Sequence, residues 1–418
     1  MLNRISLLLL ISSVLCGCSS LSSNNVDQDN PLAYCHVPLQ QQVDALALPS
    51  IESGDSAGMV VAVLTPQGQT QVFSYGYTDE TQQIPLTGDT LFAVGSVTKG
   101  FTAETVAMLV AQQQLGWQES LSALLPNTPL SDGASHVTLE QLASHTSGLP
   151  RQVNSFAMLH QFVGYLFTGN QFYAELDNGD FADYLASFEP PTTPTVIYSN
   201  LGYSILDEAI QQRVGEPVEQ LTQQLLLKPL GLKNTGYQPE LLPGYAQRAR
   251  GHAGDQPKFI ARGSQVPDWQ FHGYMVGAAN LWSSANDLLQ YARAHLYGTD
   301  NEVINQAFTD ATTMRLQVAD ADSVGLGWLR NEIEGEQILY QSGFIGGFSS
   351  YIGMDQRLKT AVVVLQNSFN WNNNIGHRML LRMAKSNDAL ACQTPIPPHE
   401  QMTASNSSDD NDQQTGGR

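Results

Sequence analysis

Basic residues are scarce in this chain of 418 residues. Lys and Arg number 19 against 39 for Asp and Glu, which gives a net charge of −20 with His neutral. A protein that binds a nucleic-acid duplex needs a cluster of cations to neutralise phosphate groups. The cations here are scattered along the chain and form no basic run. The composition therefore argues against a nucleic-acid partner.

Several motifs of metalloproteins and cofactor enzymes are also missing. The nine histidines include no H-E-x-x-H, so a zinc protease is not indicated. The four cysteines form no C-x-x-C pair. Gly325 and Gly327 lack the third glycine of a dinucleotide-binding loop. We predict no metal and no organic cofactor.

One long apolar run is present, at the N-terminus. Arg4 precedes the stretch Ile5–Leu15, whose 11 residues are too few to span a bilayer but are typical of a signal peptide. The sequence Leu15-Cys16-Gly17-Cys18 resembles a bacterial lipobox, in which Cys18 is lipidated; cleavage of an ordinary signal peptide nearby is the alternative. Ser19 after the cysteine favours the outer membrane over the inner one. We therefore expect a lipid-anchored protein on the periplasmic side of the outer membrane of a Gram-negative bacterium, where disulfides can form.

Composition divides the rest of the chain. Residues 1–18 are the predicted signal, 19–31 a Ser- and Asn-rich tether, and 397–418 a disordered acidic tail. Residues 32–396 are then one folded unit. Strand patterns occupy both of its ends, in Gly58–Leu64, Thr70–Tyr77, Gly327–Glu332, Gln337–Gln341, Phe348–Met354 and Thr360–Gln366. Helical spacing of apolar residues is found in Thr98–Gln114, Thr138–Ser144, Leu201–Val214, Val218–Leu226 and Ser284–Tyr297.

This order of elements predicts an α+β fold. One antiparallel sheet would be built from both chain ends and flanked by helices, with a mainly helical domain inserted. The α/β lobe would comprise about 45–114 and 290–395, and the helical lobe about 115–289. The substrate cleft would lie between the two lobes.

Ser96 and Lys99 open the first predicted helix, three residues apart, so one turn places both side chains on the same face. A serine hydroxyl is a poor nucleophile and needs an adjacent base. A desolvated lysine at a helix N-terminus can be that base. The spacing alone is weak evidence, since a capping serine beside a solvated lysine would look the same.

Two further motifs strengthen the interpretation. Tyr198-Ser199-Asn200 precedes a predicted helix, and Gln341-Ser342-Gly343 ends a predicted strand. The order S-x-x-K, Y-x-N and a third strand motif resembles that of the penicillin-recognising serine hydrolases. Leu142–Pro150 is similar to the L-x-x-H-T-S-G-L-P segment of that family, where His145 is interpreted as a turn residue rather than a general base. The resemblance covers about 45 to 395 and points to the branch of class C β-lactamases, DD-peptidases and AmpH-type penicillin-binding proteins.

The resemblance implies a β-lactamase-like fold and assigns roles to individual residues. Ser96 would be the nucleophile that becomes acylated. Lys99 and Tyr198 would share a proton and act as its base, and Tyr198 would pass that proton to the leaving group. Asn200 would hold the substrate amide. The backbone N–H groups of Ser96 and Phe344 would form the oxyanion hole.

Gln341 departs from the family pattern, and Ser342 and Gly343 keep it. Most relatives have Lys or His in place of Gln341, and that cation attracts the carboxylate of a β-lactam or of a D-alanyl-D-alanine terminus. Gln can donate a hydrogen bond but carries no charge. This departure favours esterase or endopeptidase activity over efficient β-lactamase or carboxypeptidase activity.

Cys35 and Cys392 are the remaining thiols once the signal is removed and Cys18 is lipidated. In the implied fold the terminal helices pack on one face of the sheet, so we predict a disulfide between the two; two separate buried thiols are the alternative. The predicted protein is a monomeric serine hydrolase that acts on peptidoglycan peptides or related amides and esters. A broad-specificity carboxylesterase of the same fold and a non-catalytic sensor of cell-wall fragments are the alternatives.

Overall fold

The computed structural model describes residues 35–386, with gaps at 80, 82, 154, 174–177, 274, 319–321 and 373. The predicted signal peptide, tether and acidic tail lie outside the described residues, and so do Cys18 and Cys392. Cys35 takes part in a disulfide, and its pairing with Cys392 stays a prediction. Within the described part of the chain, no helix combines the length and the apolar character that crossing a bilayer requires.

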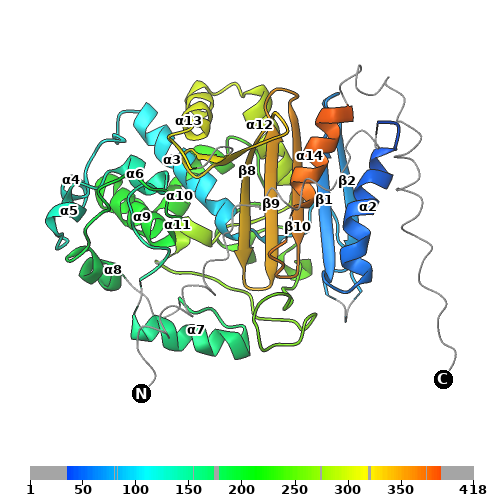
Figure 1. Cartoon of the computed structure of the whole chain (residues 1–418), viewed down its shortest axis with the longest axis horizontal. Coiled ribbons are helices and arrows are strands. Elements are labelled where there is room, and N and C mark those ends of the chain that lie inside the picture. Colours follow the sequence, from blue (N-terminus) through cyan, green and yellow to red (C-terminus); the bar gives the residue numbers. More distant parts are fainter. Residues whose placement is uncertain are drawn as a thin grey trace, which may run out of the picture.

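One antiparallel sheet of eight strands forms the centre of the structure (Figure 1). Its strand order is β2-β1-β10-β9-β8-β7-β6-β5. The strands are β1 (Gly58–Leu64), β2 (Thr70–Gly76), β5 (Leu316–Gln317), β6 (Asp322–Val324), β7 (Leu329–Ile333), β8 (Glu336–Ile345), β9 (Phe348–Asp355) and β10 (Thr360–Gln366). The N-terminal hairpin joins the C-terminal strands through β1, where Val61 pairs with Val364 of β10. The predicted sheet built from both chain ends is confirmed.

Helices cover both faces of this sheet. Helices α2 (Leu39–Glu52) and α14 (Ile375–Ser386) lie on one face, and α12 (Ala285–Tyr297) lies on the other with the start of α3 (Thr98–Ala111) (Figure 1). Every residue of β1 and of β10 is consequently buried. Burial on both faces explains why these strands read as continuous apolar runs rather than as alternating patterns.

The middle of the chain is mainly helical, as predicted, and packs beside the sheet (Figure 1). Its α-helices are α4 (Leu121–Leu124), α5 (Asp132–Ser135), α6 (Leu139–Ala143), α7 (Phe156–Thr168), α8 (Asn178–Leu185), α9 (Asn200–Val214), α10 (Val218–Thr222) and α11 (Val276–Ala279). Helix α13 (Glu302–Thr312) follows them in the chain and packs along α3. A two-stranded sheet of β3 (Phe92–Ala93) and β4 (Trp282–Ser283) links the segment before Ser96 to the segment after α11. The predicted helix Val218–Leu226 is α10 followed by a π-helical turn over Gln223–Leu227.

Candidate active site

Ser96 lies in a single 3-10 turn, Gly95–Val97, that leads directly into α3. Gly95 has a φ of 51°, a left-handed conformation that glycine adopts without the clash of a Cβ. A Cβ at this position would also lie 3.1 Å from Ile345 Cγ2 and 3.2 Å from the backbone N of Phe344. The glycine therefore allows the turn that carries Ser96 to pack directly against the end of β8.

Lys99 is buried in the first turn of α3, with 2% of its surface exposed. Its Nζ donates hydrogen bonds to Ser96 Oγ at 3.1 Å and to the carbonyl oxygen of Ala278 at 2.8 Å. The same Nζ lies 4.9 Å from the centre of the Tyr198 ring, whose π-electrons attract a cation. The structure thus brings Ser96, Lys99 and Tyr198 together from two segments about 100 residues apart in the sequence.

His145 packs against the ring of Tyr198. Its ring lies 4.4 Å from the Tyr198 ring, and its Nδ1 accepts a hydrogen bond from the backbone N of Ser199 at 3.1 Å. Burial, with smaller contributions from the charges of Lys99 and Arg151, lowers the pKa of His145 to about 3. The imidazole is therefore neutral, and its acceptor nitrogen is already paired with the backbone. These contacts fit a residue that positions Tyr198 rather than a general base.

Asn200 is the first residue of α9, and Ser199 caps that helix by accepting a hydrogen bond from Gly202 N at 2.7 Å. The Asn200 carboxamide lies beside Ser96 in a cleft and is 5% exposed. Its Oδ1 is buried and has no hydrogen-bond partner among the described residues. An unpaired buried acceptor costs about 1–3 kcal/mol. Asn200 Oδ1 is therefore an acceptor in the wall of the cleft that no described residue satisfies.

The Gln341 carboxamide is the second unpaired polar group of the site. Gln341 is 3% exposed, and neither its Oε1 nor its Nε2 has a hydrogen-bond partner in the described part of the chain. Its amide packs against Gly100, where a Cβ would lie 1.9 Å from Nε2. Glycine directly after Lys99 thus leaves the space that Gln341 occupies. Gln341, Lys99 and Tyr198 line one small recess.

Strand β8 meets the Ser96 turn at Gly343. A Cβ on Gly343 would lie 2.0 Å from the carbonyl oxygen of Val94 and 3.0 Å from the backbone N of Ser96. Since a Cβ on Gly95 would likewise lie 3.2 Å from the backbone N of Phe344, the backbone at Ser96 and the backbone at Phe344 pack directly against each other. Both glycines therefore allow the close approach of β8 to the turn that carries Ser96.

Two hollows meet at Ser96. The polar recess is lined by Ser96, Lys99, His145, Tyr198, Gly327, Trp328, Leu329, Gln341 and Ser342. The aromatic cleft is larger, enclosing about 730 Å³ that is partly open to solvent, and Ser96 and Asn200 lie in its wall. Its aromatic side chains are Phe162, Tyr165, Phe172, Tyr173, Trp269, Phe271, Phe344, Phe369 and Trp371.

The sequence contains one other serine in a hydrolase-like pattern, Gly54-Asp55-Ser56-Ala57-Gly58, which matches G-x-S-x-G. Ser56 is 2% exposed, and its hydroxyl donates to the carbonyl oxygen of Gly58 at 3.0 Å. The segment leads into β1 rather than into a strand-to-helix turn. Its serine is therefore a structural residue. Among the residues that the structure describes, no cluster of His, Cys, Asp and Glu could hold a metal ion.

Sequence reasoning missed some groups of this site, and it named Arg151 only as a distant cation that could stand in for the charge absent at Gln341. The carbonyl of Ala278 gives no side-chain signal. Arg151 directly follows the L-x-x-H-T-S-G-L-P segment, lines the aromatic cleft and lies 5.3 Å from the centre of the Tyr198 ring. For the aromatic cleft, the sequence offered one signal: Phe162 and Tyr165 are three residues apart, which places both rings on the same face of α7.

The chain is similar to several known proteins. The family model described as "Beta-lactamase" matches residues 43–382. A "Beta-lactamase" of Pseudomonas fluorescens is 29% identical over 295 residues, which cover 69% of this chain and 74% of that protein. The "D-alanyl-D-alanine-carboxypeptidase/endopeptidase AmpH" of Escherichia coli (strain K12) is 27% identical over 364 residues, or 83% of this chain and 87% of that protein.

Solved structures show the same fold. A class C beta-lactamase superimposes with a TM-score of 0.68 at 20% identity, over 82% of this chain and 95% of that one. The class C beta lactamase from Rhodobacter sphaeroides gives a TM-score of 0.67 at 23% identity, over 82% of this chain and 97% of that one. At these identities the likeness establishes the fold.

Proposed function

The chain belongs to the beta-lactamase family of serine hydrolases, and we propose that it forms an acyl-enzyme on Ser96 with peptidoglycan stem peptides or related amides and esters. The observation that carries this proposal is the 3.1 Å hydrogen bond between Lys99 Nζ and Ser96 Oγ, in a recess shared with Tyr198. A serine hydroxyl beside a buried amine and a phenol has the base that attack on a carbonyl requires. The names of two relatives, a beta-lactamase and a D-alanyl-D-alanine-carboxypeptidase/endopeptidase, support the substrate class.

In the proposed reaction, Ser96 Oγ bonds to the substrate carbonyl carbon while its proton passes to Lys99 and Tyr198, which titrate as a coupled pair. The backbone N–H groups of Ser96 and Phe344 stabilise the oxyanion. The bond from the carbonyl carbon to the leaving group then breaks, and Tyr198 delivers the proton to the leaving atom. Water attacks the Ser96 ester, transfers a proton back through the same pair, and releases the product acid with Ser96 reprotonated.

A carboxylesterase of the same fold is the second candidate, and Gln341 is the observation that favours it. The carboxamide lies in the polar recess, where a leaving group protonated by Tyr198 would depart. It can hydrogen-bond an ester or amide but offers no charge to a terminal carboxylate. A non-catalytic sensor of cell-wall fragments is disfavoured, because such a protein has no use for the base next to Ser96.

The proposed location is the periplasmic side of the outer membrane, with a lipid on Cys18. The support is the apolar run Ile5–Leu15 and the lipobox-like sequence that follows it. An oxidising compartment also suits the disulfide of Cys35, for which Cys392 is the proposed partner.

Covalent labelling with a fluorescent penicillin tests the acyl-enzyme. The wild type should be labelled and Ser96→Ala should not, whereas Ser53→Ala, on the exposed turn after α2, should be labelled like the wild type. Peptide mass spectrometry should place the adduct on Ser96. Steady-state assays on muropeptides, nitrocefin and p-nitrophenyl esters then rank peptidase, β-lactamase and esterase activity. Labelling that persists in Ser96→Ala would refute the proposed nucleophile.

A further inference from the structure

Two hollows meet at Ser96, and a substrate bound there would place one part toward each of them. Tyr198, the proposed proton donor to the leaving group, lines the polar recess. Asn200, with its unpaired Oδ1, lines the aromatic cleft. The leaving group therefore lies on the side of the polar recess, and the acyl part of the substrate lies in the aromatic cleft. The side chains of the cleft are then the ones that recognise the acyl group.

The walls of this cleft are rings packed against rings. The Trp269 ring makes T-shaped contacts with Tyr165 at 5.4 Å and with Phe172 at 5.3 Å between centroids. In another part of the wall, the Trp371 ring lies 5.0 Å from Phe344 and 4.8 Å from Phe369. Trp371 and Phe344 are only partly buried, so each presents ring surface to an occupant. Mostly apolar walls with a few polar groups are typical of a pocket for a large apolar ligand.

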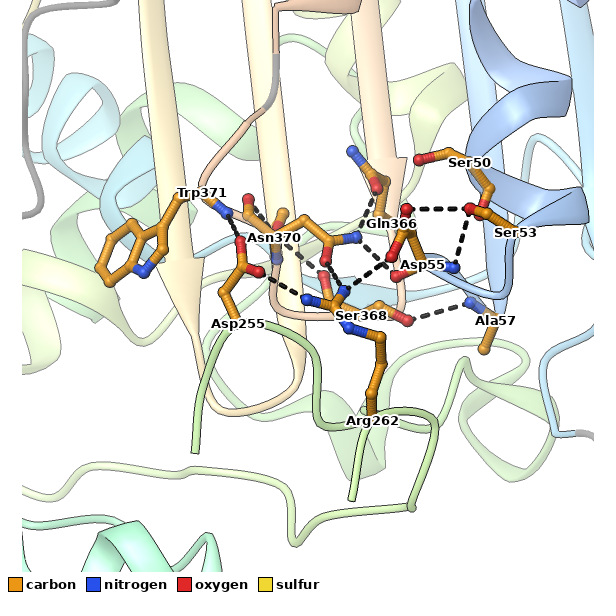
Figure 2. A network of polar contacts seen from close by, with 11 residues as sticks. Ser50, Ser53, Asp55, Ala57, Asp255, Arg262, Gln366, Ser368, Asn370 and Trp371 are labelled. Carbon is orange, nitrogen blue, oxygen red and sulfur yellow. Dashed lines mark hydrogen bonds and ion pairs between the residues drawn. The ribbon is translucent and has the colours of Figure 1, made fainter. Parts of the chain in front are cut away.

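A network of polar contacts fixes the Trp371 wall (Figure 2). The backbone N of Trp371 donates to Asp255 Oδ2 at 2.9 Å, and the other oxygen, Asp255 Oδ1, accepts from Arg262 Nη2 at 2.6 Å. Arg262 Nη1 reaches Asn370 Oδ1 at 3.1 Å and Asp55 Oδ1 at 3.3 Å. Figure 2 shows the Trp371 indole pointing away from these ionic groups. The network therefore ties the segment after β10 to the 251–271 loop and leaves the ring to the cleft.

We propose that the cleft is an acyl-group pocket that selects substrates whose acyl part carries an aromatic ring, and that Asp255 and Arg262 are positioning residues for its Trp371 wall. This inference rests on the proposed acyl-enzyme function of Ser96. It concerns recognition of the acyl part of the substrate, whereas Gln341 and the polar recess concern the leaving group.

Two esters with one leaving group test the proposal, p-nitrophenyl acetate and p-nitrophenyl phenylacetate. To correct for the intrinsic reactivity of each ester, its kcat/KM is divided by the rate constant of its hydrolysis by hydroxide. On this scale the full-length wild type should prefer the phenylacetate by about tenfold or more. Trp371→Ala should reduce that preference by about tenfold, and Trp371→Phe, which keeps a ring, should retain most of it. Asp255→Ala should reduce the preference through KM of the phenylacetate, and Asp255→Asn, which can still accept the Trp371 N–H, should reduce it less.

Phe259→Ala is the matched control, because Phe259 lies on the same loop but is 62% exposed and stacks on Phe167 away from the cleft. Its preference should equal that of the wild type. A wild type without preference for the phenylacetate, or a Trp371→Ala variant that loses equally on both esters, overturns the inference alone. Hydrolysis of neither ester, together with no penicillin labelling of Ser96, overturns the proposed function and the inference with it.

Discussion

Replacing Asp207 by asparagine should stabilise the protein in a pH-dependent manner. Asp207 is 7% exposed on α9, and its Oδ2 accepts a hydrogen bond from Gly277 N at 3.2 Å. Burial, reinforced by the negative charge of Glu219 and opposed by backbone hydrogen bonds, raises the pKa of Asp207 to about 7. The carboxylate is nevertheless placed where it holds α11, whose Ala278 carbonyl accepts a hydrogen bond from Lys99.

The sign and the size follow from proton linkage. The unfolded chain ionises near the usual pKa of 3.8 and the folded chain near 7, so the folded state holds an extra proton between these values and loses stability as pH rises through them. The full difference corresponds to about 4 kcal/mol. Between pH 5 and pH 8, Asp207→Asn should therefore gain about 3 kcal/mol of unfolding free energy relative to the wild type.

Urea unfolding followed by tryptophan fluorescence at several pH values measures this gain. Any constant cost of the asparagine, such as a poorer hydrogen bond to the backbone, cancels in the pH dependence. Glu52→Gln, at an exposed position of α2, is the control and should differ from the wild type by the same small amount at pH 5 and pH 8. A stability difference between Asp207→Asn and wild type that does not change with pH would refute the reasoning.

Three shorter predictions concern the site and the anchor. Lys99→Ala should lower the rate of Ser96 acylation by a factor of about a thousand or more, because the base is lost, while circular dichroism shows a folded protein; unchanged acylation would contradict the role of Lys99. Gln341→Lys should raise kcat/KM for nitrocefin or a D-alanyl-D-alanine peptide by about five- to thirtyfold and change a neutral p-nitrophenyl ester much less, since it restores a charge worth about 1–2 kcal/mol; no gain on the charged substrates would reject Gln341 as a specificity determinant. Metabolic labelling with palmitate should tag the wild type and not Cys18→Ser, and a labelled variant would remove the support for lipidation at that cysteine.

The central strands were predictable because their environment is simple. Gly58–Leu64 and Thr360–Gln366 were expected as strands and have those bounds, since a strand covered on both faces must be apolar throughout. Helices α7 and α13 were not expected, and the terminal helices α2 and α14 were expected only from the family resemblance, without bounds. In α7, Phe156 and Phe167 remain exposed, so its apolar residues do not mark a single buried face that periodicity could identify.

The candidate site was predictable where a motif is local. Ser96 and Lys99 are three residues apart, and one helical turn is enough to bring their side chains into contact. The aromatic cleft has no such signal, because α7, the 251–271 loop and the segment after β10 meet only in the folded protein. The contact between Gly100 and Gln341 joins residues far apart in the sequence, so the glycine that makes room for the carboxamide is recognisable only in three dimensions.

The absence of a cation at residue 341 has a physical consequence in this recess. A charged side chain there would share a buried space with Lys99, and two like charges close together disfavour each other's ionisation. Gln341 avoids that repulsion while keeping a hydrogen-bond donor at the same position. Arg151 brings a positive charge to the same region from another segment, because it lines the aromatic cleft and lies 5.3 Å from the centre of the Tyr198 ring. A carboxylate on the leaving group would therefore meet the Gln341 carboxamide rather than a cation at residue 341, which is the physical reason for the gain expected from Gln341→Lys.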